Sequence, residues 1–134
     1  MRRDKLILVD TEWVQQSEKF LALQRWVFDL VNHINAAGFG VDEITDVLLT
    51  HLHFDHCGGA VFWDNAKERY DVQFKNANYW SNENHWNWAT KPNPREKASF
   101  LDENLLPIKE SGRLGFLKNT SNEFVFSKEL GIEV

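Results

Sequence analysis

The sequence lacks several features that mark out particular classes of protein. It has a single cysteine, Cys57, which excludes an internal disulfide framework and suits a reducing, cytoplasmic compartment. No apolar run approaches the roughly 18 residues that a membrane span needs. The first apolar run, residues 6–9, is also shorter than the core of about 7–15 residues that a signal peptide needs. We therefore expect a soluble cytoplasmic protein.

Basic residues are also in the minority. The 134 residues include 15 Lys and Arg against 20 Asp and Glu, which gives a net charge of −5 at pH 7. No long Lys/Arg run occurs, and no basic groove residues alternate with the aromatic ones. We therefore expect neither nucleic acid nor a membrane as a partner. With three prolines and 43% hydrophobic residues, the composition instead indicates one globular domain over residues 1–134.

The spacing of apolar residues predicts an α/β domain. Residues 5–9 and 47–50 are short apolar runs typical of buried strands. Between them, apolar residues recur at spacings of three and four over residues 20–34, which predicts a helix capped by Ser17 and ended by Gly38. A strand, a helix and a strand in this order predict two neighbouring parallel strands.

The second half of the chain predicts shorter elements. Ser81 is expected to cap a helix that runs through Trp88. The sequence Asn-Pro-Arg-Glu at residues 93–96 is typical of a helix start, so a further helix is expected from Asn93 to about Asn104. Four segments are expected to be extended: residues 61–63, 70–74, 114–117 and 123–126. The first two flank a polar surface stretch at residues 64–69.

Three of the five histidines lie within six residues, in the sequence THLHFDHCGG at residues 50–59. Because alternate residues after a strand point the same way, His51, His53 and Asp55 can converge. His56 can join them if the chain curls at Asp55, and the two glycines beyond would give the backbone freedom to do so. Imidazole nitrogens and carboxylate oxygens are zinc ligands, and so many in one short loop favour two ions roughly 3.5–4 Å apart. The alternative is a polar strand end whose histidines bind backbone carbonyls.

This segment resembles the metal-binding motif of the metallo-β-lactamase superfamily, whose members place it after an inner strand of an αββα sandwich. Residues 7–11, an apolar strand ending in Asp-Thr, and residues 44–50, the run into the motif, also resemble that family. Residues 74–80, with Glu83 and Trp86 after them, resemble its branch of lactonases and organophosphate-ester hydrolases. The resemblance covers essentially the whole chain but only the N-terminal part of the family fold, so we expect an incomplete domain.

The resemblance implies that the complete fold is a two-zinc hydrolase of an ester, a lactone or a related acyl or phosphoryl bond. For this chain by itself we expect weak or single-metal binding and activity near background. His51 and His53 would bind the first ion, and Asp55 and His56 the second. A hydroxide bridging the two ions would be the nucleophile. Asp55 would also pass a proton to the leaving group. Asp10 would orient a ligand histidine from behind.

Other functions stay open at this point. A thioester hydrolase or a phosphodiesterase would use the same ligands. A non-catalytic module that pairs with a second copy as a homodimer is a further possibility, because half a sandwich leaves one sheet face uncovered. Glu12 departs from the family, which usually has glycine there. Cys57 is expected to be a small buried residue, His33 a partly exposed helix residue, and His85 a packing residue among tryptophans.

Overall fold

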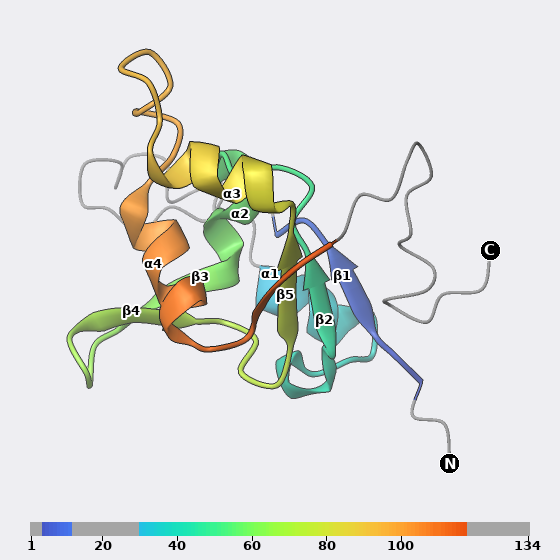
Figure 1. Cartoon of the computed structure of the whole chain (residues 1–134). Helices are drawn as coiled ribbons and strands as arrows, with labels where there is room; N and C mark the ends of the chain where they lie inside the picture. Colours follow the sequence, from blue (N-terminus) through green and yellow to red (C-terminus); the bar gives the residue numbers. More distant parts are fainter. Residues whose placement is uncertain (1–3, 12–29, 118–134) are drawn as a thin grey trace.

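The computed structural model describes residues 4–11 and 30–117 of the chain (Figure 1). Four short strands form one sheet in the order β1-β2-β5-β6, and all neighbouring strands in it are parallel. These strands are β1 (Ile7–Val9), β2 (Asp46–Leu48), β5 (Asn78–Ser81) and β6 (Leu114–Phe116). A separate antiparallel hairpin consists of β3 (Val61–Asp64) and β4 (Arg69–Val72).

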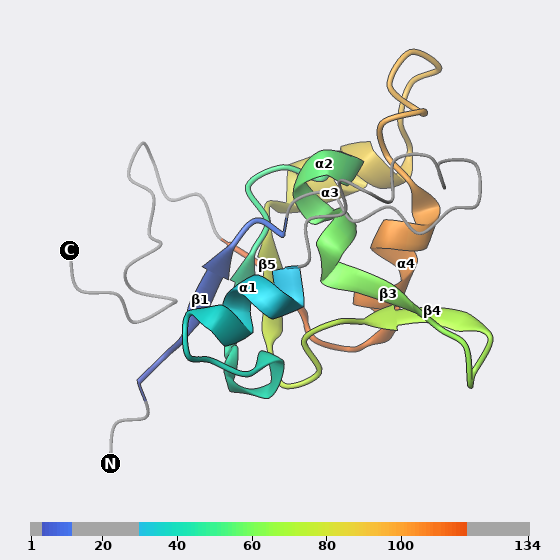
Figure 2. The same ribbon diagram turned by 180° about the vertical axis from the view of Figure 1, so that it is seen from behind.

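The described helices lie between strands along the chain. They are α1 (Leu30–Ala36), α2 (Phe54–Cys57), α3 (Glu83–Thr90) and α4 (Asp102–Glu110), with short 3-10 turns at η2 (Val41–Glu43) and η3 (Gly58–Ala60). The helix α4 packs on the hairpin of β3 and β4. Figure 2 shows α1 in front of β1 and β2. Over the ranges described, no helix is long and apolar enough to cross a membrane. The mixture of parallel sheet and helices confirms the predicted α/β class.

The predicted strand–helix–strand unit is present at the start of the chain. β1 and β2 lie parallel, with Leu8 opposite Val47 in the register. The helix α1 ends at Ala36, and Gly38 follows it with a φ of +93°, a conformation that favours glycine. The amides of Gly38 and Phe39 donate back to the carbonyls of Asn35 and Ile34, which closes the helix as predicted. The expected start of this helix, from Ser17, lies outside the described residues.

Two helix starts were predicted wrongly. Ser81 is not a cap but the buried last residue of β5, and Asn82 caps α3 by accepting a hydrogen bond from the His85 amide at 3.2 Å. Asn93 does accept from nearby amides, but only turns follow it. The Ser99 carbonyl, which lies just before α4, accepts a hydrogen bond from the Phe54 amide at 3.0 Å. It is therefore bonded to another segment and not within a helix. The helix α4 begins only at Asp102, near the predicted end of the expected one.

The other predicted extended segments agree with the structure where it describes them. β3 and β4 flank the polar stretch that begins at Asp64, whose carboxylate accepts from the amides of Ala66 and Lys67. β6 falls within residues 114–117 as expected. The segment at residues 123–126 lies outside the described residues. β5 is the strand that the sequence did not predict, and its parallel pairing with β2 brings the start of α3 to the edge of the sheet where β2 ends.

Candidate metal centre

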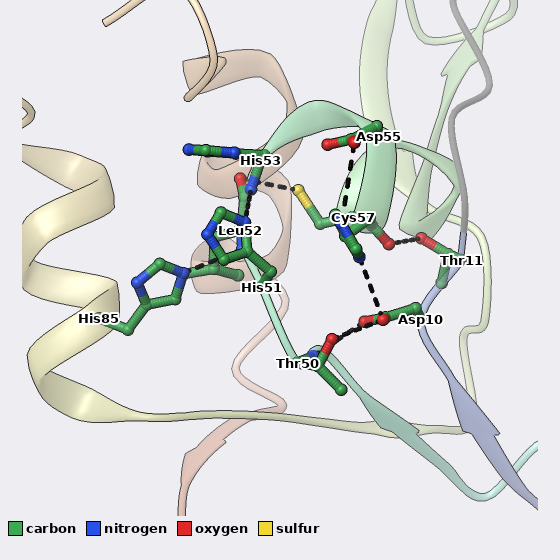
Figure 3. A network of polar contacts seen from close by, with 10 residues as sticks. Asp10, Thr11, Thr50, His51, Leu52, His53, Asp55, Cys57 and His85 are labelled. Carbon is green, nitrogen blue, oxygen red and sulfur yellow. Dashed lines mark hydrogen bonds and ion pairs between the residues drawn. The ribbon is translucent and has the colours of Figure 1, made fainter. Parts of the chain in front are cut away.

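The histidine motif lies just beyond the carboxyl end of β2, where a central parallel strand opens into a loop (Figure 3). Leu52 is wholly buried, which turns the residues on either side of it away from the core. His53 is the residue before α2, and the chain enters that short helix at Phe54. The curl that His56 needs to approach the other ligand candidates therefore begins one residue before Asp55.

His51 and His53 form a close pair of imidazole rings. Their ring centroids are 3.9 Å apart, and Nδ1 of His51 accepts a hydrogen bond from the His53 amide at 3.1 Å. Nε2 of His53 is buried and has no hydrogen-bond partner in the part of the chain that the structure describes. A buried polar atom without a partner is costly, and a metal ion is one group that would satisfy this nitrogen.

Asp55 and His56 form a second pair on α2. Nε2 of His56 lies 3.7 Å from Oδ2 of Asp55, and the Asp55 side chain is 58% exposed. The ring centroids of His51 and His56 are 5.4 Å apart, so the two pairs are neighbours. The four predicted ligands therefore lie as two neighbouring pairs, His51 with His53 and Asp55 with His56.

Asp10 stands behind the second pair. Its φ of +55° turns the chain sharply after β1, a conformation that aspartate tolerates better than most residues. One carboxylate oxygen accepts from the Thr50 amide at 2.8 Å, and the other accepts from the Thr50 hydroxyl and lies 3.2 Å from Nδ1 of His56. A contact between Asp10 and a motif histidine was expected, whereas Thr50 as its second partner was not.

His85 is a residue of this site that the sequence reasoning missed. Its ring centroid lies 4.8 Å from that of His51, and its Nε2 accepts a hydrogen bond from the Leu52 amide at 3.0 Å. We expected His85 to be a packing residue among tryptophans, but it also contacts the histidine motif. Burial is the largest cause that lowers the pKa of both His51 and His85, with neighbouring histidines adding to it. The neutral imidazole that this favours is the form that binds metals.

The two glycines after the motif were both expected to give the backbone freedom, but the structure gives them different roles. Gly58 has an ordinary helical φ of −60°, so it is not needed for special backbone freedom. Gly59 is needed for space, because a Cβ there would lie 2.3 Å from the backbone oxygen of Thr11. Cys57 is buried as predicted, its thiol donates to the Leu52 carbonyl, and burial raises its pKa to about 12.

The donor set suits a zinc-type ion, although the side chains are not drawn together around one point. Within residues 4–11 and 30–117, no group of three or more His, Cys, Asp or Glu side chains is arranged to hold a metal ion. What the structure offers is two pairs of ligand candidates and the unpartnered Nε2 of His53. Each pair supplies two donors, and zinc sites use three or four protein ligands.

The chain belongs to the metallo-beta-lactamase superfamily, whose family model matches residues 2–116. No curated protein matches the sequence. Among solved structures, a probable metal-dependent hydrolase from Staphylococcus aureus is 25% identical with a TM-score of 0.66, and the match covers 84% of this chain and 40% of that one. AidC, a dizinc quorum-quenching lactonase in complex with a product, is 25% identical with a TM-score of 0.61, and the match covers 91% and 43% of the two chains.

A third structure, the hydrolase AbOPH of the beta lactamase superfamily, is 19% identical with a TM-score of 0.61 and supports the fold alone. The match covers 88% of this chain and 41% of that one. The chain thus spans less than half the length of the solved structures that it matches. The predicted family and its partial coverage are both confirmed.

Proposed function

We propose that this protein is a metal-dependent hydrolase of an ester, a lactone or a related acyl or phosphoryl bond. The observation that carries the proposal is the buried, unpartnered Nε2 of His53 beside the His51 ring. The pair formed by Asp55 and His56 lies next to it, and Asp10 contacts His56 from behind. Membership in the metallo-beta-lactamase superfamily and the hydrolases among the similar structures support the same conclusion.

Two zinc ions are the proposed cofactors. His51 and His53 would hold one ion, and Asp55 with His56 would hold the other. When bound, such ions polarise a carbonyl or phosphoryl oxygen and lower the pKa of a bound water toward neutrality. Asp10 would keep the His56 ring in place through Nδ1, which leaves Nε2 of that ring for a metal.

Asp55 has a second proposed role, that of proton donor to the leaving group. Its side chain is 58% exposed, so it can reach a substrate atom outside the protein surface. Nε2 of its neighbour His56 lies 3.7 Å from Oδ2 of Asp55, so the carboxylate is next to the proposed metal position. A carboxylate that both ligates and transfers a proton fits the hydrolysis of an ester or lactone, in which an alkoxide must leave.

A small-molecule ester or lactone is the substrate class that we favour. One similar structure is a dizinc lactonase in complex with N-hexanoyl-L-homoserine, a lactone hydrolysis product. A thioester or a phosphodiester would suit the same donor set, because a bound metal ion polarises carbonyl and phosphoryl oxygens alike. The net charge of −5 counts against a nucleic-acid phosphodiester.

The test measures metal content and hydrolysis on the same preparation. The 134-residue chain is loaded with zinc, its zinc content is determined, and it is assayed with an aryl ester, an acyl lactone and a thioester. His53→Ala is the test variant and His33→Ala the matched histidine control on α1. We expect the wild type and His33→Ala to bind zinc and His53→Ala to lose it. We expect hydrolysis only in the preparations that contain zinc. A chain that binds no zinc, or a His53→Ala variant with unchanged zinc content, would refute the proposed site.

A further inference from the structure

The Leu52 peptide groups are held from both sides by side chains of other segments (Figure 3). The Leu52 amide donates to Nε2 of His85 at 3.0 Å, and the Leu52 carbonyl accepts from the Cys57 thiol at 3.3 Å. Because Leu52 is wholly buried, each of these backbone groups needs a partner inside the protein. Leu52 stands between His51 and His53, so the orientation of its peptide groups sets the direction of both side chains.

His85 is itself firmly anchored. It lies in the first turn of α3, where the Asn82 side chain accepts from the His85 amide at 3.2 Å. Its ring packs beside both His51 and Phe100, with centroid distances of 4.8 Å and 5.9 Å. A backbone amide can only donate, so Nε2 of His85 must be the acceptor and the ring proton belongs on Nδ1. The acceptor is thus brought to the motif by a helix that begins 31 residues after Leu52.

We propose that His85 is a positioning residue of the metal centre, which fixes the angle between His51 and His53 by holding the peptide group that joins His51 to Leu52. This inference rests on the proposed function. His85 would not be a ligand, because its Nε2 is occupied by the Leu52 amide. Without an acceptor, that buried amide would be left unpaired, and the peptide would rotate or recruit water. Either change moves the two ligand rings.

Two substitutions separate the acceptor from the bulk of the ring. His85→Gln keeps an acceptor oxygen at a similar reach, whereas His85→Leu keeps bulk but has no acceptor. Cobalt(II) is titrated into the full chain, and its visible absorption bands report both affinity and ligand geometry. We expect His85→Leu to weaken cobalt binding by about 10-fold or more and to change the band shape. We expect His85→Gln to restore most of the affinity. Urea unfolding of both variants establishes that they fold.

A metal-free measurement keeps the two proposals distinguishable. Amide exchange of Leu52 should be faster in His85→Leu than in the wild type or His85→Gln, and nitrogen shifts should place the His85 proton on Nδ1. Equal cobalt affinity in all three proteins would overturn the positioning role, and so would an equal loss in both variants. If the wild type binds no cobalt, the proposed function fails. Faster Leu52 exchange in His85→Leu would then still identify His85 as the residue that holds this loop.

Discussion

Replacing Gly59 with alanine should force apart the two segments that carry Asp10 and the histidine motif. A Cβ at Gly59 would lie 2.3 Å from the backbone oxygen of Thr11 and 3.2 Å from its Cβ. Thr11 is wholly buried, and both its amide and its hydroxyl donate to the His56 carbonyl, at 2.8 Å and 3.0 Å. The clash is therefore with backbone, and no flexible side chain can move to relieve it.

The size of the effect follows from these contacts. Real Cβ atoms essentially never approach within 3.0 Å, so the separation must grow by at least 3.0 − 2.3 = 0.7 Å. Overpacking of this kind costs about 1–3 kcal/mol. Weakening two hydrogen bonds to His56 adds about 0.5–1.5 kcal/mol for each bond. We expect a total loss of about 2–6 kcal/mol, which is a large part of the roughly 5–15 kcal/mol by which a domain is stable.

Urea unfolding followed by tryptophan fluorescence measures this loss. Gly40→Ala is the matched control, because nothing lies within 4 Å of a Cβ at Gly40 and its φ is −95°. We expect that control to stay within about 1 kcal/mol of the wild type, since alanine fits this conformation. A Gly59→Ala variant that unfolds at the same urea concentration as Gly40→Ala would refute the close approach between the motif and Thr11.

Three further results are expected around the motif. His51→Ala and His53→Ala should each lower metal affinity in a competition titration far more than His33→Ala, and equal losses at all three positions would contradict the predicted ligands. Asp10→Ala should weaken metal binding by about 10–100-fold, because the His56 ring loses its Nδ1 partner, and unchanged affinity would show that Asp10 does not orient it. The Cys57 thiol should not react with a disulfide reagent at pH 8, because burial raises its pKa to about 12, and it should react fully in urea.

The parts of the site that the sequence could predict are those carried by neighbouring residues. His51, His53, Asp55 and His56 lie in one run of six residues, so their chemistry is visible without the fold. The contact between Asp10 and His56 was accessible only through the family resemblance, because 46 residues separate them.

His85 could not be placed because β5 was not recognised as a strand. Its sequence, Asn-Tyr-Trp-Ser, has polar residues at both ends and no long apolar run. Once β5 pairs parallel to β2, the carboxyl ends of both strands meet at one edge of the sheet, and the residues that follow each strand become neighbours. A strand assignment at residues 78–81 was therefore the missing signal for His85.

The helix expected from Asn93 failed because a tertiary contact outweighed a local signal. The Asn-Pro-Arg-Glu sequence does form a capped turn, with Asn93 accepting from the amides of Arg95 and Glu96. The Ser99 carbonyl is then taken by the Phe54 amide, and Phe100 turns into the core against His53. Capping patterns predict where a helix can start, but they do not predict which carbonyls will accept hydrogen bonds from another segment.

The face of the sheet opposite α1 leads to the last prediction, that the chain forms a homodimer. Val47 and Tyr79 pack in one buried cluster with Leu30 and Ile34 of α1. Side chains alternate along a strand, so the row of Val9, Leu48 and Trp80, which pair across the sheet, lies on the other face. Figure 1 shows no helix of the described residues in front of β1 and β2 on this face.

Val9 is the exposed end of that row, at 58% exposure, and β1 is the edge strand of the sheet among the described elements. An uncharged row beside an open edge favours pairing with an identical row across a two-fold axis. We expect the wild-type chain to sediment as a dimer and Val9→Lys to sediment as a monomer. Phe39→Lys is the matched control, because Phe39 is 45% exposed but follows α1 on the covered side. A monomeric wild type, or a dimer that survives Val9→Lys, would show that this face is not the contact.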